Sequence, residues 1–234
     1  MRFSLIIPCF NESKNLKLII ERVYSIFLEK DIELILVDNG STDDSRIILG
    51  KFLKIYPFLK VVFIKKNIGY GHGILEGLRH AKGKILGWTH ADLQTDPLDF
   101  IKALENYSEK LNNSNFFIKG RRIKRPFFDS FFTFSMSIFE SILFREVIYD
   151  VNAQPTLFHR DFYKSWVNPP EDFAIDLYVY FLAKKNRYNI YRFPVNFSKR
   201  IFGISSWNYS LKSKWIFILR TINYSLRLNF LKNK

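Results

Sequence analysis

Asp92 and Gln94 are the residues of this sequence best suited to hold a metal ion. They bring a carboxylate and an amide oxygen one residue apart, directly after the apolar run 84–89. Mg²⁺ and related divalent cations prefer oxygen ligands of this kind. The alternative for the same residues is a polar turn, in which Asp96 caps a helix that begins at Pro97.

The chain contains no sequence motif for binding phosphate through backbone amides. No segment matches G-x-x-x-x-G-K-[ST], and the glycines of 69–73 do not have the spacing of the dinucleotide-binding fingerprint. A nucleoside diphosphate bound to this chain would therefore need a divalent cation, held by side chains, to offset its charge. For a phosphorylated ligand of this type, the sequence predicts a metal site at 92–94.

The elements that would position this site alternate between strand and helix patterns. Strand-like apolar runs at 3–7, 33–37, 60–64 and 84–89 are separated by segments with apolar residues at helical spacing. This order predicts an α/β fold with a mostly parallel, doubly wound sheet and helices on both faces. Ligands of such sheets bind beyond the carboxyl ends of the strands. Three polar turns are therefore expected to meet at one edge, and they are 11–12, 38–39 and 90–94.

The second half of the chain is less regular. Strands are expected at 115–119, 155–158 and 189–197, and helices at 127–149, at 172–185 and from 211 onward. No internal repeat or linker interrupts the sequence. We therefore expect one domain over 1–206, followed by a basic amphipathic segment over 207–234.

Composition excludes several classes of protein. Of the 234 residues, 47% are hydrophobic and 25% are charged, which is too apolar for a disordered chain. The single cysteine, Cys9, excludes an internal disulfide and is compatible with a reducing compartment. No charge-free apolar run approaches ~18 residues, so no membrane-spanning helix is expected. The start of the chain predicts a first strand rather than a signal peptide.

The positive charge is concentrated at the C-terminal end. The net charge is +14, and twelve of the 36 Lys and Arg residues lie beyond Asp176, where no acidic residue follows. Such asymmetry indicates an anionic partner. The basic tail alone would also suit a nucleic acid, but the 25 Phe favour a membrane surface. We predict no nucleic-acid partner.

The C-terminal segment has the pattern of a cationic amphipathic helix. One face carries Trp215, Ile218, Leu219, Ile222, Leu226 and Phe230, and the surrounding basic residues are Lys212, Lys214, Arg220, Arg227, Lys232 and Lys234. A helix of this kind can lie in the interface of an anionic membrane, and the aromatic stretch 127–144 could add a second contact. The alternative is that both segments pack on the sheet as ordinary core.

Six segments, in chain order, resemble the motifs of inverting family-2 glycosyltransferases. The resemblance covers residues 3–206, and dolichyl- and polyprenyl-phosphate sugar transferases are the subgroup that the motifs resemble most. The segments are Ser4–Glu12 (P-x-Y-N-E), Leu36–Asp43 (V-D-D-G-S-x-D), Asn67–Gly83 (N-x-G and the helix that follows), Gly87–Pro97 (D-A-D-L-Q-x-x-P), Lys119–Arg122 (G-x-R) and Arg200–Ser205 (R-x-x-G-x-S).

The resemblance implies a GT-A fold, a nucleotide-sugar donor and inversion at the anomeric carbon. It places the nucleotide against Pro8, Phe10, Glu12, Asp38 and Asn39, and it directs Arg122 and Arg200 toward the diphosphate or an acceptor phosphate. Mn²⁺ or Mg²⁺ would be held by Asp92, Gln94 and His90. Asp176 is the candidate general base, with Asp172 as the second choice.

Three positions depart from the family pattern. His90 stands where the first metal-binding Asp is expected, Asn39 replaces the second acidic residue of its turn, and Ser206 stands where the subgroup often has Lys. Imidazole suits Mn²⁺ better than Mg²⁺. Uracil presents one N–H donor beside an acceptor, and an amide side chain can bind both, whereas the adjacent donors of guanine suit a carboxylate better. Asn39 therefore predicts a preference for UDP-sugars over GDP-sugars.

The sequence therefore predicts a metal-dependent glycosyltransferase at the cytoplasmic face of a membrane. Its acceptor would be a lipid-linked polyprenyl phosphate or an envelope glycan. One alternative is transfer to a soluble hydroxyl acceptor. Another is a catalytically weak module that binds nucleotide sugars, since His90 alters the metal site. The transferred sugar and the oligomeric state are not predicted.

Overall fold

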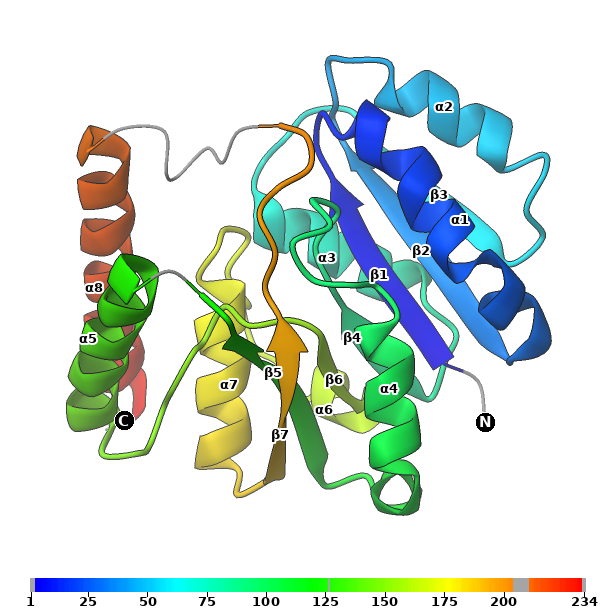
Figure 1. The fold of residues 1–234 in the computed structure, drawn as a ribbon. Coiled ribbons are helices and arrows are strands. Elements are labelled where there is room, and N and C mark those ends of the chain that lie inside the picture. Colours follow the sequence, from blue (N-terminus) through cyan, green and yellow to red (C-terminus); the bar gives the residue numbers. More distant parts are fainter. Residues whose placement is uncertain (1–2, 126, 204–210, 233–234) are drawn as a thin grey trace.

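The fold is built on one mixed sheet, seen in a computed structural model that describes residues 3–125, 127–203 and 211–232 (Figure 1). In these residues the strand order is β3-β2-β1-β4-β6-β5-β7. The strands are β1 (Phe3–Cys9), β2 (Ile32–Asn39), β3 (Leu59–Ile64), β4 (Ile85–Trp88), β5 (Phe116–Ile123), β6 (Thr156–His159) and β7 (Asn189–Asn196).

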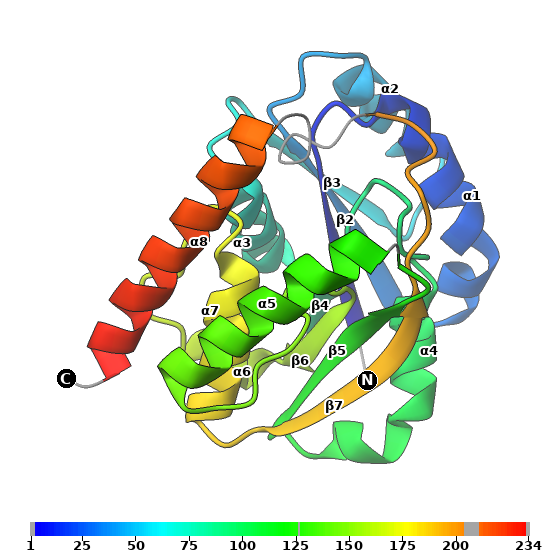
Figure 2. The same cartoon turned by 60° about the vertical axis from the view of Figure 1, so that its left-hand side comes forward.

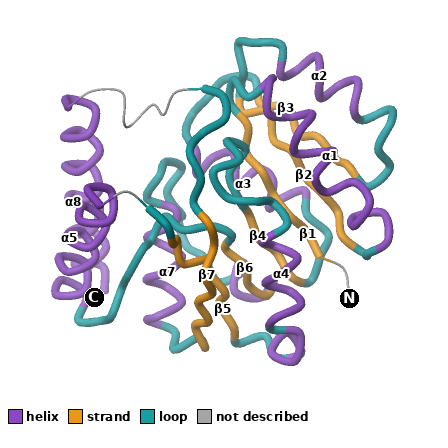
Figure 3. The backbone as a smooth tube through the Cα atoms, viewed as in Figure 1, coloured by secondary structure: helices purple, strands orange, loops and turns teal. Residues whose placement is uncertain are grey.

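The helices alternate with the strands along the first two thirds of the chain (Figure 3). They are α1 (Ser13–Glu29), α2 (Ser45–Phe52), α3 (Tyr70–His80), α4 (Asp99–Asn106), the 3₁₀ helix η1 (Ser108–Asn112), α5 (Phe127–Phe144), α6 (Arg160–Lys164), α7 (Ile175–Lys185) and α8 (Leu211–Lys232).

The strand pairing confirms the predicted sheet. β1 runs parallel to β2 and β4, β2 runs parallel to β3, and β5 runs parallel to β7. Among the seven described strands, β6 alone is antiparallel to its neighbours, β4 and β5. The polar turns after β1, β2 and β4 therefore share one edge of the sheet, as parallel pairing requires.

Two apolar layers hold the helices to the sheet. Alternate residues of each strand face opposite sides, so Leu5 and Ile7 of β1 pack with α1, α2 and α4, whereas Ile6 packs with α3, α6 and α7. The predicted apolar face of α1 is buried, and its members include Leu16 and Val23. Helices therefore cover both faces, as predicted.

α5 and α8 pack on each other at one flank of the molecule, beside α7 (Figure 2). Their outward faces carry large apolar side chains that are exposed, and these include Phe131, Phe134, Ile138, Ile142, Trp215, Leu219 and Phe230. Among the described residues, no helix is long and apolar enough to cross a membrane.

Several element boundaries differ from the sequence-based prediction. The helix predicted over 127–149 ends at Phe144, because Arg145 takes a left-handed conformation (φ 54°) that breaks the helical path. The helix predicted from Asp172 begins at Ile175, after a turn in which Asp172 Oδ1 accepts from the amide of Ala174. The short elements η1 and α6 were not predicted.

Candidate active site

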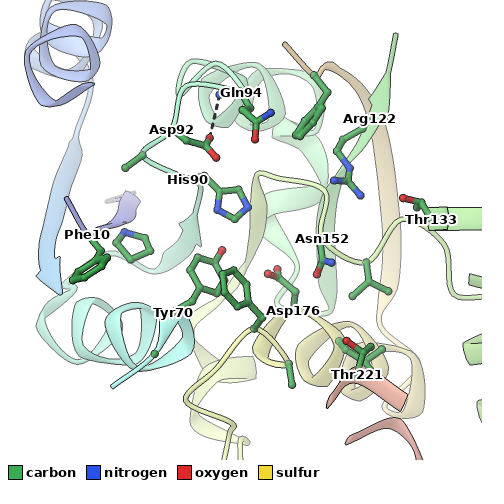
Figure 4. A pocket seen from close by; sticks show the side chains of 18 of the residues that line it. Phe10, Tyr70, His90, Asp92, Gln94, Arg122, Thr133, Asn152, Asp176 and Thr221 are labelled. Carbon is green, nitrogen blue, oxygen red and sulfur yellow. Dashed lines mark hydrogen bonds between the residues drawn. The ribbon is translucent and has the colours of Figure 1, made fainter. Parts of the chain in front are cut away.

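A cavity of about 820 Å³ opens at the carboxyl edge of the sheet (Figure 4). One end is formed by the turns after β1, β2 and β4, and the other by α5, the start of α7 and α8. The cavity brings together most of the predicted site residues, namely Pro8, Phe10, Glu12, Asn39, His90, Asp92, Gln94, Arg122, Asp176 and Arg200. Asp38 and Asp172 do not line it.

The turn after β1 is tied to the turn after β2. Asn11 adopts a positive φ of 57°, and its Oδ1 accepts a hydrogen bond from the amide of Thr42 at 2.8 Å. The amide of Glu12 donates to Ser45 Oγ at 3.0 Å. Burial raises the pKa of the Glu12 carboxyl, which accepts from the side chain of Asn15. These contacts build one wall of the cavity from two segments about thirty residues apart.

Asp38 and Asn39 are adjacent in sequence and have different surroundings. Asp38 is fully buried, and its Oδ1 accepts from the amide of Ser41 at 3.0 Å, so its carboxylate holds the turn. Asn39 lines the cavity and donates from Nδ2 to the carbonyl of Gly69 at 2.9 Å. Its Oδ1 is buried without a hydrogen-bond partner among the described residues. Asn39 therefore brings to the cavity wall an amide oxygen whose hydrogen-bonding capacity is unused among the described residues.

The turn after β4 presents Asp92 to the centre of the cavity. Leu93 has a positive φ of 55°, and the amide of Gln94 donates back to Asp92 Oδ1 at 3.1 Å. The other carboxylate oxygen, Oδ2, accepts from Arg200 Nη2 at 2.8 Å. Gln94 binds the loop that carries Arg200, because its Nε2 donates to the carbonyl of Ser198. A local turn thus fixes Asp92, and a distant loop lies against it.

His90 belongs to an aromatic stack on the cavity wall. Its ring lies 5.2 Å from the ring of Tyr70, which in turn stacks on Phe173 at 4.9 Å. Burial is the main cause that lowers the pKa of His90, so the imidazole is neutral at neutral pH and keeps a free lone pair. Figure 4 shows His90 and Asp92 directed into the same part of the cavity.

The basic residues of the site are held by partners. Arg122 forms an ion pair with Asp150, with Nε 2.8 Å from Oδ1, and its guanidinium lies over the ring of Phe197. These contacts hold the guanidinium plane at the cavity wall, where it can still face an oxyanion.

The far end of the cavity includes polar residues that sequence reasoning missed. Thr133, Ser137 and Glu140 lie on one face of α5 at helical spacing, and Thr221 of α8 lies nearby (Figure 4). Glu140 is 3% exposed, and burial raises its pKa to about 8. These polar residues of α5 therefore face the cavity together with Phe132 and Met136, whereas Phe131, Phe134, Ile138 and Ile142 are exposed on the outer side of the helix. Helical periodicity at 133, 137 and 140 was the available signal.

The residues present can accommodate a cation. Asp92 Oδ2 already holds a positive group, the guanidinium of Arg200, and His90 adds a neutral nitrogen ligand. Among the described residues, no cluster of three or more His, Cys, Asp or Glu side chains forms a complete metal site. A cation bound here would therefore share its coordination shell with ligand oxygens, as phosphate-bound Mg²⁺ does.

Comparison with known proteins identifies the family. The model of the family "Glycosyl transferase family 2" matches residues 4–159, which is two thirds of the chain. The chain belongs to this family. The resemblance of its motifs to this family is therefore confirmed.

Curated relatives of the chain include proteins named for polyprenyl phosphates. It is 32% identical over 102 residues to the dodecaprenyl-phosphate galacturonate synthase of Rhizobium johnstonii, covering 42% of this chain and 30% of the relative. It is 29% identical over 132 residues to the dolichol-phosphate mannosyltransferase of Pyrococcus furiosus, covering 55% of this chain and 37% of the relative. The chain thus spans about a third of the length of these relatives.

Solved structures confirm the GT-A fold of the glycosyltransferase. A mannosyltransferase from Pyrobaculum calidifontis, in complex with GDP-Man and Mn²⁺, matches with a TM-score of 0.63 and 21% identity, over 86% of this chain and 57% of that one. Glucosyl-3-phosphoglycerate synthase from Mycobacterium tuberculosis, in complex with Mn²⁺, UDP and glucosyl-3-phosphoglycerate, matches with a TM-score of 0.74 and 17% identity, over 97% and 79%.

Proposed function

We propose that this glycosyltransferase moves a sugar from a nucleoside diphosphate sugar to a polyprenyl phosphate, with inversion and with the help of Mn²⁺ or Mg²⁺. The observation that carries the proposal is the continuity of the cavity. It extends from the turns at the sheet edge, where a nucleotide is expected, to α5 and α8, whose outer faces expose large apolar side chains. Donor and lipid acceptor could therefore meet inside one site.

The donor end supports a nucleoside diphosphate sugar. Asn39 Oδ1 can accept an N–H of the base, and the side chains of Pro8 and Phe10 border the same region. Nδ2 of Asn39 is already bound to the Gly69 carbonyl. We keep UDP as the preferred nucleotide, since uracil needs a single acceptor for its one N–H, whereas guanine presents adjacent donors.

Asp92 and His90 are the residues that would hold the cation, and Gln94 could add its amide oxygen. A divalent cation offsets the charge that develops on the departing diphosphate. The related structures with Mn²⁺ and a nucleotide or nucleotide sugar support this assignment. The role of the chain is to present Asp92 from a rigid turn, so that cation and diphosphate are aligned before reaction.

The acceptor end supports a phosphate nucleophile. An acceptor phosphate is already anionic and needs alignment and charge neutralisation more than a general base. Arg122 is held in place by Asp150 and can orient a phosphate oxygen toward the anomeric carbon. The names of the relatives that use dodecaprenyl and dolichol phosphate point to the same acceptor class.

A hydroxyl acceptor is the second candidate, because one observation favours it. A hydroxyl nucleophile needs a general base, and Asp176 places a carboxylate on the cavity wall. Asp172 is exposed, does not line the cavity and binds the amide of Ala174. Between the two carboxylates predicted as base, Asp176 is therefore the one that we retain.

The exposed face of α5 and α8 supports work at a membrane. Trp215, Leu219 and Phe230 project outward from α8, and Arg220 and Arg227 are exposed on the same helix. The predicted contributions of Lys212, Lys214, Lys232 and Lys234 lie outside the described side chains. Because the cytoplasmic leaflet is anionic, we propose a peripheral position at the cytoplasmic face.

Transfer can be measured directly with radiolabelled donors. Purified protein is incubated with Mn²⁺, undecaprenyl phosphate in detergent, and labelled UDP-glucose, UDP-galacturonate or GDP-mannose, and the lipid fraction is counted. We expect label in the lipid fraction with one donor, and none without the cation. Label on a soluble alcohol but not on lipid would favour the second candidate. Failure of the protein to bind any of the three donors would refute both.

A further inference from the structure

Lys119 is a fully buried lysine next to the active site. It lies on β5, is 0% exposed, and does not line the cavity. Its Nζ lies 2.7 Å from Thr156 Oγ1 and 3.1 Å from Asp176 Oδ1. Asp176, in the first turn of α7, is 1% exposed and borders the cavity. The lysine therefore stands behind the carboxylate, on the side away from the ligand space.

Gln154 completes a closed network around the same oxygen. Its Nε2 donates to Asp176 Oδ1 at 2.8 Å, and its Oε1 accepts from Thr156 Oγ1 at 3.0 Å. The ammonium of Lys119 and the amide of Gln154 therefore both bind Oδ1, and the phenol of Tyr70 acts on the same carboxylate from the cavity side. The phenol of Tyr70, which also lines the cavity, lies 3.4 Å from Gln154 Nε2. A network in which every member is bonded holds one carboxylate in one orientation.

The network has an energetic cost that packing does not explain. Burial lowers the pKa of Lys119 to about 8, although the charge of Asp176 raises it. Two weaker effects on the same pKa oppose each other, because Arg192 lowers it and Asp150 raises it. A buried ion pair can often be replaced by apolar residues without loss of stability. A pair that is retained at the wall of a ligand cavity is therefore a candidate for a role in binding.

We infer that Lys119 is a positioning residue, which fixes Asp176 so that its carboxylate, at the cavity wall, binds a hydroxyl group of the transferred sugar. The inference rests on the proposed function and deepens it, because it assigns recognition of the sugar to a defined carboxylate. A carboxylate whose Oδ1 is bound to an ammonium and an amide is held in one orientation, in which its remaining lone pairs can accept a hydrogen bond. With a phosphate acceptor, no base is required, so sugar recognition is the task left for Asp176.

The test separates binding of the sugar from binding of the nucleotide. Calorimetry with Mn²⁺ compares UDP with UDP-glucose and UDP-galacturonate, and GDP with GDP-mannose. We use the donor that the wild-type protein binds most tightly. The sugar contribution is the affinity for this nucleotide sugar divided by the affinity for its free nucleotide. Asp176→Asn and Lys119→Met should each lower it about tenfold, as expected for the loss of one charge-assisted hydrogen bond. The affinity for the free nucleotide should not change.

The double variant Lys119→Met/Asp176→Asn keeps the inference testable if Lys119→Met alone fails to fold. It leaves neither charge unpaired, and its sugar contribution should equal that of Asp176→Asn, since both changes act through one carboxylate. Lys60→Met is the matched control. Lys60 Nζ lies 2.5 Å from the buried Glu33 carboxylate, at the other end of the strands, so its loss should leave the sugar contribution unchanged.

Each other outcome has a defined meaning. Three results would overturn the inference. Lys119→Met could keep the sugar contribution of wild type, or the effects of the two substitutions could add in the double variant. The third is a loss of affinity for the free nucleotide together with the loss of the sugar contribution. A wild-type protein that binds its nucleotide and nucleotide sugar equally would also overturn it, without touching the proposed function. A wild-type protein that binds no nucleotide would refute the proposed function itself.

Discussion

Arg200 Nη2 lies 2.8 Å from Asp92 Oδ2, so a guanidinium is bonded to the carboxylate that is assigned to the cation. Two further hydrogen bonds join the loop that carries Arg200 to the turn that carries Asp92. The amide of Ser198 donates to the carbonyl of Gln94, and Gln94 Nε2 donates to the carbonyl of Ser198. A cation bound to this carboxylate would be repelled by the guanidinium beside it. Cation binding and the position of Arg200 are therefore coupled.

Removing Arg200 should strengthen cation binding and weaken transfer. In Arg200→Gln the Asp92 carboxylate loses its competing positive partner, so Mn²⁺ should bind the ligand-free protein several-fold more tightly. Transfer should fall at least about tenfold, because the guanidinium is no longer available to bind the diphosphate. Electron paramagnetic resonance of free Mn²⁺ gives the affinity. Weaker Mn²⁺ binding in Arg200→Gln would show that Arg200 does not compete for Asp92.

Asp92→Asn should abolish transfer without unfolding the protein. The variant keeps the side-chain shape but removes the negative charge that holds the cation, so we expect a loss of at least about 10²-fold in kcat. The melting temperature should stay near that of wild type. Asp99→Asn is the control, because Asp99 pairs with Lys102 on α4 and does not line the cavity. Substantial activity in a folded Asp92→Asn protein would rule out Asp92 as the metal ligand.

His90→Asp should change the choice of cation. An imidazole ligand suits Mn²⁺ better than Mg²⁺, whereas a second carboxylate suits both. We expect the ratio of activities with Mg²⁺ and Mn²⁺ to rise several-fold in the variant, which is measured in parallel assays at saturating cation. The same ratio in wild type and His90→Asp would mean that the imidazole does not contact the cation and serves only in the stack with Tyr70.

Parts of this site follow from sequence patterns and parts do not. Continuous apolar runs locate the strands, and parallel order brings the turns at 11–12, 38–39 and 90–94 to one edge. The pleat decides which of two adjacent polar residues reaches a ligand, and at Asp38 and Asn39 the pattern alone did not show that only Asn39 faces the cavity.

Lys119 and Glu140 were missed for a different reason. A charged residue in a strand or helix is usually exposed, so sequence position does not reveal one that is buried by later elements. The partners of Lys119 come from β6 and α7, and Glu140 is buried at the end of the cavity that α5 and α8 form together. Both depend on contacts between segments far apart in the chain.

Glu140 should make stability depend on pH. Burial raises its pKa to about 8 in the folded protein, against about 4.3 in an unfolded chain. Between these values the folded state holds a proton that the unfolded state has lost, so stability falls as pH rises through this window and levels off above about 8. Glu140→Gln removes the effect. At pH 8 the free energy of unfolding of Glu140→Gln should exceed that of wild type by several kcal/mol, since each pKa unit corresponds to about 1.4 kcal/mol.

Urea unfolding at pH 8 and at pH 5 measures this difference. The increase in the free energy of unfolding from wild type to Glu140→Gln should be large at pH 8 and small at pH 5. Glu21→Gln is the control, because it removes a carboxylate that is exposed on α1. Equal gains of Glu140→Gln at the two pH values would show that the Glu140 carboxyl is not held protonated by the fold.

The outer face of α8 should bind anionic membranes. Trp215, Leu219 and Phe230 are 63%, 53% and 65% exposed, and nearby basic residues each contribute about 1 kcal/mol of attraction at an anionic surface. Wild type should sediment with phosphatidylserine vesicles in low salt and be released by high salt. Trp215→Ser/Leu219→Ser/Phe230→Ser should sediment much less while keeping its fold and nucleotide affinity. Ile47→Ser removes an equally exposed apolar residue from α2 and should sediment like wild type. Equal sedimentation of the triple variant and Ile47→Ser would exclude α8 as the membrane contact.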